Sequence, residues 1–111
     1  MKKLSIITVT YNSEKYLAEC IESVIGQTYP NIEHIIIDGK SKDATVSIIQ
    51  KYSNHIARWV SETDRGMYDA INKGLELASG DFVGILNSDD MLDTPEVIAA
   101  IVKAFEENNT D

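Results

Sequence analysis

The sequence predicts an α/β fold in which a mostly parallel sheet is flanked by helices. Apolar runs rich in Ile, Val and Thr alternate along the chain with segments whose apolar residues recur at helical spacing. This alternation favours parallel strands joined by right-handed helical crossovers. Polar and acidic segments follow the strands, whereas the connections that lead into the strands carry no cluster of carboxylates. The 111 residues suffice for one domain with a real core.

Four strands are predicted, at residues 4–10, 32–37, 56–60 and 81–86. The second contains Ile35-Ile36-Ile37, which is apolar on both faces, as a central parallel strand covered on both sides is. The loops that follow the strands should then lie along one edge of the sheet, where open α/β sheets bind ligands. These loops are residues 11–12, 38–43, 62–66 and 87–90.

Helices are predicted between the strands and after the last one. The first has an apolar face formed by Tyr16, Leu17, Cys20, Ile21, Val24 and Ile25. Cys20 on this face indicates a core residue, with a reactive thiol as the alternative. The second spans about residues 44–52, and Gly80 matches a C′ glycine after the third. Thr94-Pro95 starts the fourth, with an N-cap threonine and proline at the first helical position. The buried side of the third helix is predicted to hold Met67, Ala70, Ile71, Leu75 and Ala78.

Composition excludes several classes of function. The formal net charge of −8 argues against a nucleic-acid binder and against electrostatic docking on anionic lipid. No apolar stretch approaches the length of a membrane span, and the apolar run after Lys2-Lys3 is too short for a signal peptide. We therefore expect a cytoplasmic chain without nucleic-acid partners or membrane contact. His34 and His55 are isolated and are expected to be structural or surface residues.

Two adjacent carboxylates, Asp89 and Asp90, directly follow the last apolar strand. Such a pair supplies hard oxygen ligands that suit Mg²⁺ or Mn²⁺, and a divalent cation there would neutralise a bound diphosphate. Asn, Ser and Asp are also ordinary turn residues, so by themselves residues 87–90 favour an acidic turn. The pair alone leaves both interpretations open.

Five segments, in this order, together resemble the nucleotide-binding half of the family 2 glycosyltransferases, which have the Rossmann-like GT-A fold. They are residues 5–12, 23–31, 37–45, 64–74, and 78–81 running into 86–90. The similarity covers nearly the whole chain. It implies that residues 1–111 form the nucleotide-diphospho-sugar-binding half of a glycosyltransferase domain, in a protein of cell-envelope polysaccharide biosynthesis.

The family transfers a sugar from a nucleotide diphosphate donor, here expected to be UDP-linked, to an acceptor hydroxyl with inversion. By this resemblance Tyr11 packs on the base, and Asp38 hydrogen-bonds the base or the ribose. Asp89 touches the ribose or the metal, and Asp90 ligates Mn²⁺ or Mg²⁺. The nucleotide-binding residues that it implies are Thr8, Tyr11, Asp38, Arg65 and Asp89.

Structural alternatives stand beside these roles. Tyr11 also fits an aromatic that covers the sheet edge, Asp38 an Asx turn, and Arg65 an exposed loop arginine. The chain departs from the family at Gly39, where many members have a second consecutive acid that often recognises the base.

The family's general base and its acceptor-binding half come from a later segment. No catalytic residue is therefore expected in this chain, and the base is expected beyond Asp111. We expect a truncated part of a longer enzyme, inactive by itself, whose missing regions bind a glycan or lipid-linked acceptor at the inner face of the membrane. The end of the chain directly after a helix, at residues 108–111, favours the same expectation.

Two other classes of protein compete with this interpretation. A receiver-like phosphoacceptor domain of flavodoxin-like fold fits the size, and Asp38 could take the phosphoryl group. Such domains carry an acidic pair after the first strand, where this chain has Tyr11-Asn12. The other alternative is a module that binds a sugar nucleotide but does not transfer the sugar. Sugar-nucleotide transferases have a similar sheet architecture, but they carry a glycine-rich loop after the first strand, and this chain lacks that loop.

Overall fold

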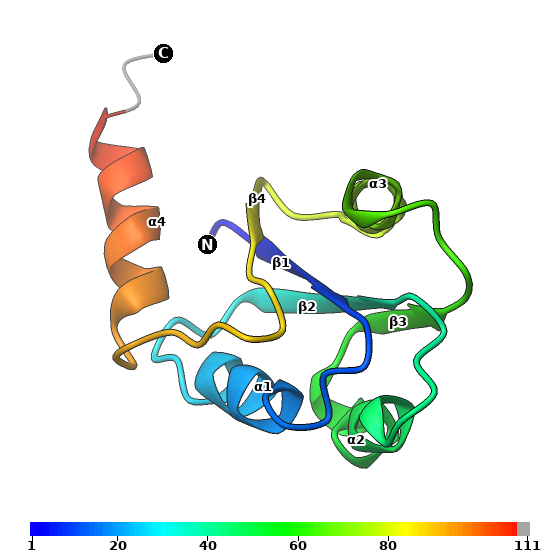
Figure 1. Cartoon of the computed structure of the whole chain (residues 1–111). Helices are drawn as coiled ribbons and strands as arrows, with labels where there is room; N and C mark the ends of the chain where they lie inside the picture. The colour runs from blue at the N-terminus through cyan, green and yellow to red at the C-terminus, as the bar shows by residue number, and fades with distance from the viewer. Residues whose placement is uncertain (109–111) are drawn as a thin grey trace.

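The computed structural model describes residues 1–108 as a parallel sheet with helices on both faces (Figure 1). The predicted α/β class is therefore confirmed. In chain order the elements are β1 (Leu4–Thr10), α1 (Leu17–Ile25), β2 (Ile32–Asp38), α2 (Thr45–Lys51), the 3₁₀ turn η1 (Ser53–His55), β3 (Arg58–Ser61), α3 (Met67–Leu77), β4 (Phe82–Ile85) and α4 (Val97–Asn108). Residues 109–111, which belong to the segment on which the expectation of a truncated chain depends, lie outside the described residues. None of the helices in residues 1–108 is long and apolar enough to cross a membrane.

The strand order β3-β2-β1-β4 places β1 and β2 in the centre of the sheet, and all neighbouring strands are parallel. Thr10 at the end of β1 pairs with Asp38 at the end of β2, and Asp38 pairs with Ser61 at the end of β3. The three strands thus end level with one another. The loops that follow the strands meet at one edge, as the alternation of strands and helices predicts.

Both faces of the central strands are buried. Ile35 and Ile37 pack with Ile7 on the face that α3 covers, while Ile36 packs with Leu17 on the face of α1 and α2. These five side chains are fully inaccessible to solvent. Because successive residues of a strand point to opposite faces, three consecutive isoleucines serve two cores, and the prediction for β2 is confirmed.

The predicted buried side of α3 is wrong at two positions. Met67 is 56% exposed and Leu75 is 46% exposed, whereas Ala70 and Gly74 are buried. A Cβ atom at Gly74 would lie only 2.5 Å from Cγ2 of Ile7. The helix therefore approaches β1 through two small residues one turn apart, and this close approach turns the larger apolar side chains away from the sheet.

Gly80 is not the helix cap that the sequence predicts. The cap residue of α3 is Ala78, which has extended backbone angles. A Cβ at Gly80 would lie 2.5 Å from Oγ and 2.7 Å from the backbone nitrogen of Ser5. Glycine is needed here because the chain entering β4 passes directly against β1.

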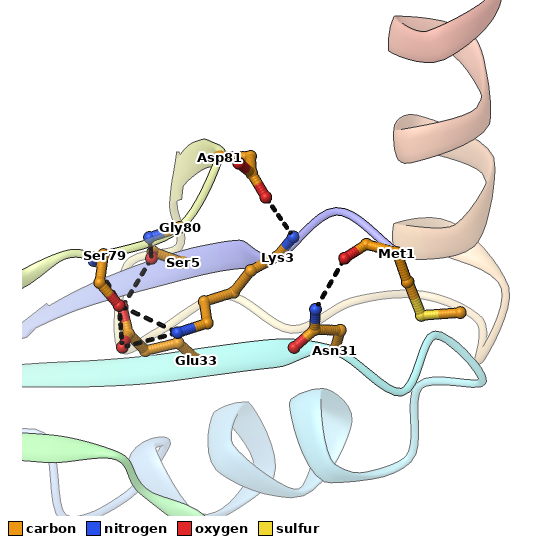
Figure 2. Close-up of polar contacts among 8 residues, drawn as sticks. All are labelled: Met1, Lys3, Ser5, Asn31, Glu33, Ser79, Gly80 and Asp81. Atoms are coloured by element: carbon orange, nitrogen blue, oxygen red, sulfur yellow. Dashed lines mark hydrogen bonds and ion pairs between the residues drawn. The ribbon is translucent and has the colours of Figure 1, made fainter.

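A polar network holds this passage at the amino ends of the strands (Figure 2). The carboxylate of Glu33 accepts hydrogen bonds from the Ser5 hydroxyl at 2.7 Å, and from the Ser79 backbone N–H and hydroxyl at 2.9 and 2.8 Å. The Lys3 ammonium lies 3.8 Å from the same carboxylate, and the Gly80 N–H donates to the Ser5 hydroxyl. We call these five residues the amino-edge network; it fixes the start of β4 on β1 and β2.

Helix α4 begins at Val97, two residues later than the proline start predicted at Pro95. Its first turn is capped from another part of the chain, because Oε1 of Gln27 accepts the Ile98 N–H at 2.9 Å. The amide nitrogen of Gln27 donates to the Thr94 carbonyl at 2.8 Å. Ile98 and Val102 also pack against β1, and the ring of Phe105 stacks on the ring of Phe82 in β4. These contacts complete the attachment of α4 to the sheet.

Candidate functional site

A cavity of about 570 Å³ opens at the edge of the sheet where the strands end. Its size lies in the usual range for small-molecule sites. Three of the four loops predicted at this edge, those after β1, β3 and β4, line the cavity together with the start of α3, while the loop after β2 lies outside it. The lining residues of this carboxyl-edge cavity are Val9, Thr10, Tyr11, Asn12, Ser13, Tyr16, Asp64, Gly66, Met67, Ala70, Asn87, Ser88 and Asp89.

Large apolar side chains line part of the carboxyl-edge cavity. Tyr11 is 57% exposed there, and Tyr16 and Met67 are about half exposed. Exposed aromatic faces can pack on a planar base or on the apolar face of a sugar. The sequence predicts Tyr11 as a contact but assigns Tyr16 and Met67 to helix cores, because their spacing is that of the apolar stripe.

Asp38 does not line the cavity. It is fully buried, and its carboxylate accepts hydrogen bonds from the backbone N–H of Ser41 at 2.9 Å and its hydroxyl at 2.5 Å, and from the Ser61 hydroxyl at 2.7 Å. These bonds make the turn that opens the loop after β2, which is the structural alternative for this residue. A contact of Asp38 with a nucleotide stays a prediction.

Side-chain bonds tie the loops of this edge together. Asn12 has a left-handed backbone with φ of 48°, its N–H donates to the Ser41 hydroxyl, and its Oδ1 accepts the Lys42 N–H. The hydroxyls of Ser13 and Ser88 lie 2.8 Å apart, which links the turn after β1 to the loop after β4. The turn that follows Tyr11 is therefore tied to the loop that carries the acidic pair.

Asp89 and Asp90 are both exposed, and only Asp89 lines the cavity. A backbone bond from the Asp90 N–H to the Asn87 carbonyl makes the turn that carries the pair. Within residues 1–108, no three His, Cys, Asp or Glu side chains gather closely enough to hold a metal alone. Mg²⁺ and similar ions usually take one or two carboxylates together with substrate phosphates and water. Asp89 and Asp90 could supply the one or two carboxylate ligands of such a site, with phosphates and water as the remaining ligands.

Two buried polar atoms at the cavity have no partner among the described residues. They are Oγ1 of Thr10 and Oδ1 of Asn87, and both residues line the cavity. Buried polar groups are nearly always hydrogen-bonded, so these two oxygens are exceptions beside the cavity. Sequence analysis missed both, because threonine at a strand end and asparagine in a turn are ordinary there.

Thr8 lies in the interior of the fold. It is fully buried, and its hydroxyl lies 2.8 Å from Nε2 of His34 and 4.0 Å from the sulfur of Cys20. Its side chain thus has a structural partner and does not line the cavity, so the structure gives no support to a nucleotide contact by Thr8. Burial lowers the pKa of His34 to about 4, which keeps this ring neutral at pH 7.

Cys20 is a core residue, as predicted. Burial raises the pKa of its thiol to about 11; the Thr8 hydroxyl opposes this rise, and the charges of Asp90 and Asp89 add to it. A neutral buried thiol is a poor nucleophile, so the alternative of a reactive cysteine has no support.

Arg65 is exposed and is not among the residues that line the cavity. Its backbone N–H donates to Oδ2 of Asp69 at 2.9 Å, which fixes the loop before α3. The preceding residue, Asp64, does line the cavity, and its Oδ1 accepts a hydrogen bond from the Gly66 N–H at 3.1 Å. The φ of 113° at Gly66 requires glycine. Sequence analysis gave Asp64 no role of its own, although this residue begins one of the five segments that resemble the family.

A parallel α/β sheet with a cavity at its carboxyl edge belongs to the class of open α/β folds that bind ligands at this edge. The family model for glycosyl transferase family 2 matches residues 5–111. The chain therefore belongs to glycosyltransferase family 2, and its fold is the expected GT-A fold. This assignment removes the receiver-like alternative.

The relatives are longer than this chain. An uncharacterised glycosyltransferase of Mycobacterium tuberculosis is 41% identical over 103 residues, which cover 92% of this chain and 39% of that protein. Chondroitin synthase of Escherichia coli is 36% identical over 104 residues, which cover 92% of this chain and 15% of that protein. The chain thus spans less than half the length of these relatives.

Solved structures agree in fold. Residues 1–349 of S. aureus TarS, in complex with UDP-GlcNAc, superpose with a TM-score of 0.87 at 32% identity, covering 95% of this chain and 31% of that one. The mannosyltransferase PcManGT from Pyrobaculum calidifontis, in complex with GDP-Man and Mn²⁺, gives a TM-score of 0.87 at 27% identity, covering 94% and 32%.

Proposed function

We propose that this chain binds the nucleoside diphosphate part of a sugar donor together with a divalent cation. The observation that carries the proposal is the carboxyl-edge cavity, which joins an exposed tyrosine to an acidic turn in a member of glycosyltransferase family 2. TarS and PcManGT, which have the same fold, were crystallised with UDP-GlcNAc and with GDP-Man and Mn²⁺. We favour a UDP-linked donor.

The larger protein would transfer the sugar to an acceptor hydroxyl with inversion. Residues 1–111 would be its donor-binding half, and the acceptor, a glycan or a lipid-linked glycan, would bind to parts outside this chain. We assign no general base to the described residues. A role in the assembly of envelope polysaccharides at the inner membrane face belongs to the same proposal.

The cavity suggests a role for each wall. Tyr11 packs on the base. Asp90 holds Mn²⁺ or Mg²⁺, and Asp89, which lines the cavity, contacts the ribose or the metal. When bound, the ion would offset the negative charge that develops on the departing diphosphate. Arg65 is an exposed cation near this edge and would meet the phosphates.

Calorimetry on the 111-residue chain tests this proposal. UDP is expected to bind more tightly with Mn²⁺ than with EDTA. Asp90→Ala should weaken the metal-dependent binding about tenfold, or about 1.4 kcal/mol. Asp93→Ala removes an equally exposed carboxylate just past the site and serves as the matched control.

Two outcomes of this experiment distinguish the metal-binding part of the proposal from the nucleotide-binding part. Equal UDP affinity in Mn²⁺ and EDTA would contradict the metal role of the acidic pair. Absence of any UDP or GDP binding to the unmodified chain would contradict nucleotide binding itself.

A further inference from the structure

Gly39 lies against the carboxylate of Asp64. A Cβ atom at Gly39 would lie 2.9 Å from Oδ2 of Asp64 and 3.4 Å from Cδ1 of Tyr11. Since real Cβ contacts essentially never fall below 3.0 Å, a side chain at position 39 would push the Asp64 carboxylate out of its present position. Position 39 is where many family members carry a second acid. In this chain an acid from the loop after β3 fills that space.

Asp64 is better placed than Asp38 to meet a ligand. The Asp38 carboxylate is buried and already accepts three hydrogen bonds, whereas Asp64 lines the cavity together with Tyr11. The bond from the Gly66 N–H engages Oδ1 of Asp64. Oδ2, which lies 2.9 Å from the position of a Cβ at Gly39, accepts no hydrogen bond from the residues that the structure describes.

We infer that Asp64 determines the base specificity of the site: its Oδ2 accepts a hydrogen bond from a ring N–H of the base that packs on Tyr11. This inference rests on the proposed function. An ionised carboxylate is only an acceptor. Uracil and guanine present a ring N–H on their pairing edge, whereas cytosine and adenine present a ring nitrogen with a lone pair. Uridine and guanosine diphosphates are therefore preferred over cytidine and adenosine diphosphates.

The pairing of Gly39 with Asp64 predicts that the acid can be exchanged between the two positions. Gly66 is the glycine with positive φ among the described residues, so the backbone at Gly39 accepts a side chain once the Asp64 carboxylate is removed. Gly39→Asp alone should displace the Asp64 carboxylate from its present position. The double variant Gly39→Asp/Asp64→Gly should regain base selectivity.

Calorimetry on this chain with UDP, GDP, CDP and ADP at saturating Mn²⁺ tests the inference. The unmodified chain should bind UDP or GDP about tenfold more tightly than CDP, the ratio expected for one hydrogen bond to a charged group. Asp64→Ala should bring this ratio close to one by weakening UDP and GDP, and the control Asp93→Asn should leave it unchanged. The arms with UDP and GDP decide which of the two bases is preferred.

N3-methyl-UDP, which lacks the ring N–H, provides a second readout. Methylation should weaken binding to the unmodified chain and leave binding to Asp64→Ala unchanged. If Asp64 only shaped the loop through Gly66, its removal would weaken all four nucleotides equally, and that result would overturn the inference. An unchanged ratio of UDP to CDP affinity in Asp64→Ala would overturn it as well. No binding of any nucleotide by the unmodified chain would contradict the proposed function, and the inference with it.

Discussion

Glu33→Ala should destabilise the fold from the edge opposite the cavity. The side chain is 12% exposed and accepts three hydrogen bonds within the amino-edge network, two of them from Ser79. Bonds to charged groups contribute about 1.5–3 kcal/mol each, and water can replace part of this where the side chain is partly accessible. We expect a loss of about 3 kcal/mol in the free energy of unfolding, a large share of the stability of a small domain.

Urea unfolding followed by circular dichroism measures this loss. Glu33→Gln keeps an acceptor for the Ser5 hydroxyl and the Ser79 N–H, and gives up the ion pair with Lys3, so it should cost about 1 kcal/mol. Glu76→Ala, on the exposed side of α3, is the matched control and should stay within about 0.5 kcal/mol of the unmodified chain. Equal urea midpoints for Glu33→Ala and Glu76→Ala would refute the structural role of the network.

The same variant carries a pH signature. Burial disfavours ionisation of Glu33, but the bonds from Ser79 and Ser5 and the charge of Lys3 outweigh it and hold the pKa below the ordinary value of 4.5. A carboxyl with a lowered pKa stabilises the fold above its unfolded pKa and loses this contribution as the pH falls through its folded pKa. The stability gap between the unmodified chain and Glu33→Ala should therefore narrow below about pH 4.5.

Two further predictions concern the core. His34 has a pKa of about 4 in the fold against an ordinary 6.5, so only the unfolded chain protonates between these values. The free energy of unfolding should therefore fall by about 3 kcal/mol as the pH falls from 6.5 to 4. If the free energy of unfolding of His34→Gln fell equally steeply over this pH range, that result would contradict the prediction. Gly74→Ala should destabilise by about 1–3 kcal/mol because its Cβ meets Ile7, despite the higher helix propensity of alanine. Thermal unfolding of Gly74→Ala beside Asn72→Ala, at an exposed position of the same helix, checks the second; equal melting temperatures would rule out the contact.

Sequence periodicity was sufficient to predict the order of strands and helices and the edge at which polar loops meet. The alternation of strands with helices decides both, and it depends on residue type alone. Boundaries moved by up to a few residues, as at β3, which was expected at 56–60 and runs from Arg58 to Ser61. The buried side of α3 could not be predicted, because it depends on how closely the helix approaches Ile7.

The site was predicted at the level of the edge and less well at the level of side chains. Tyr11 and Asp89 line the cavity, whereas Asp38 and Thr8 are buried behind it. Both sit in or at the end of a strand, and sequence periodicity does not say which polar side chains of a buried strand find internal partners. Asp64 could have been suspected only by asking what replaces the acid missing at position 39.

Gln27 gives α4 an attachment of a different kind from the one that anchors β4. A carboxamide has no titrating proton in the range where proteins fold, and ionic strength does not screen its bonds as it screens a lysine–glutamate pair. Low pH or high salt should thus weaken the attachment of the start of β4 to β1 and β2, while α4 stays docked. The two ends of the same chain segment, residues 80–98, respond to different conditions.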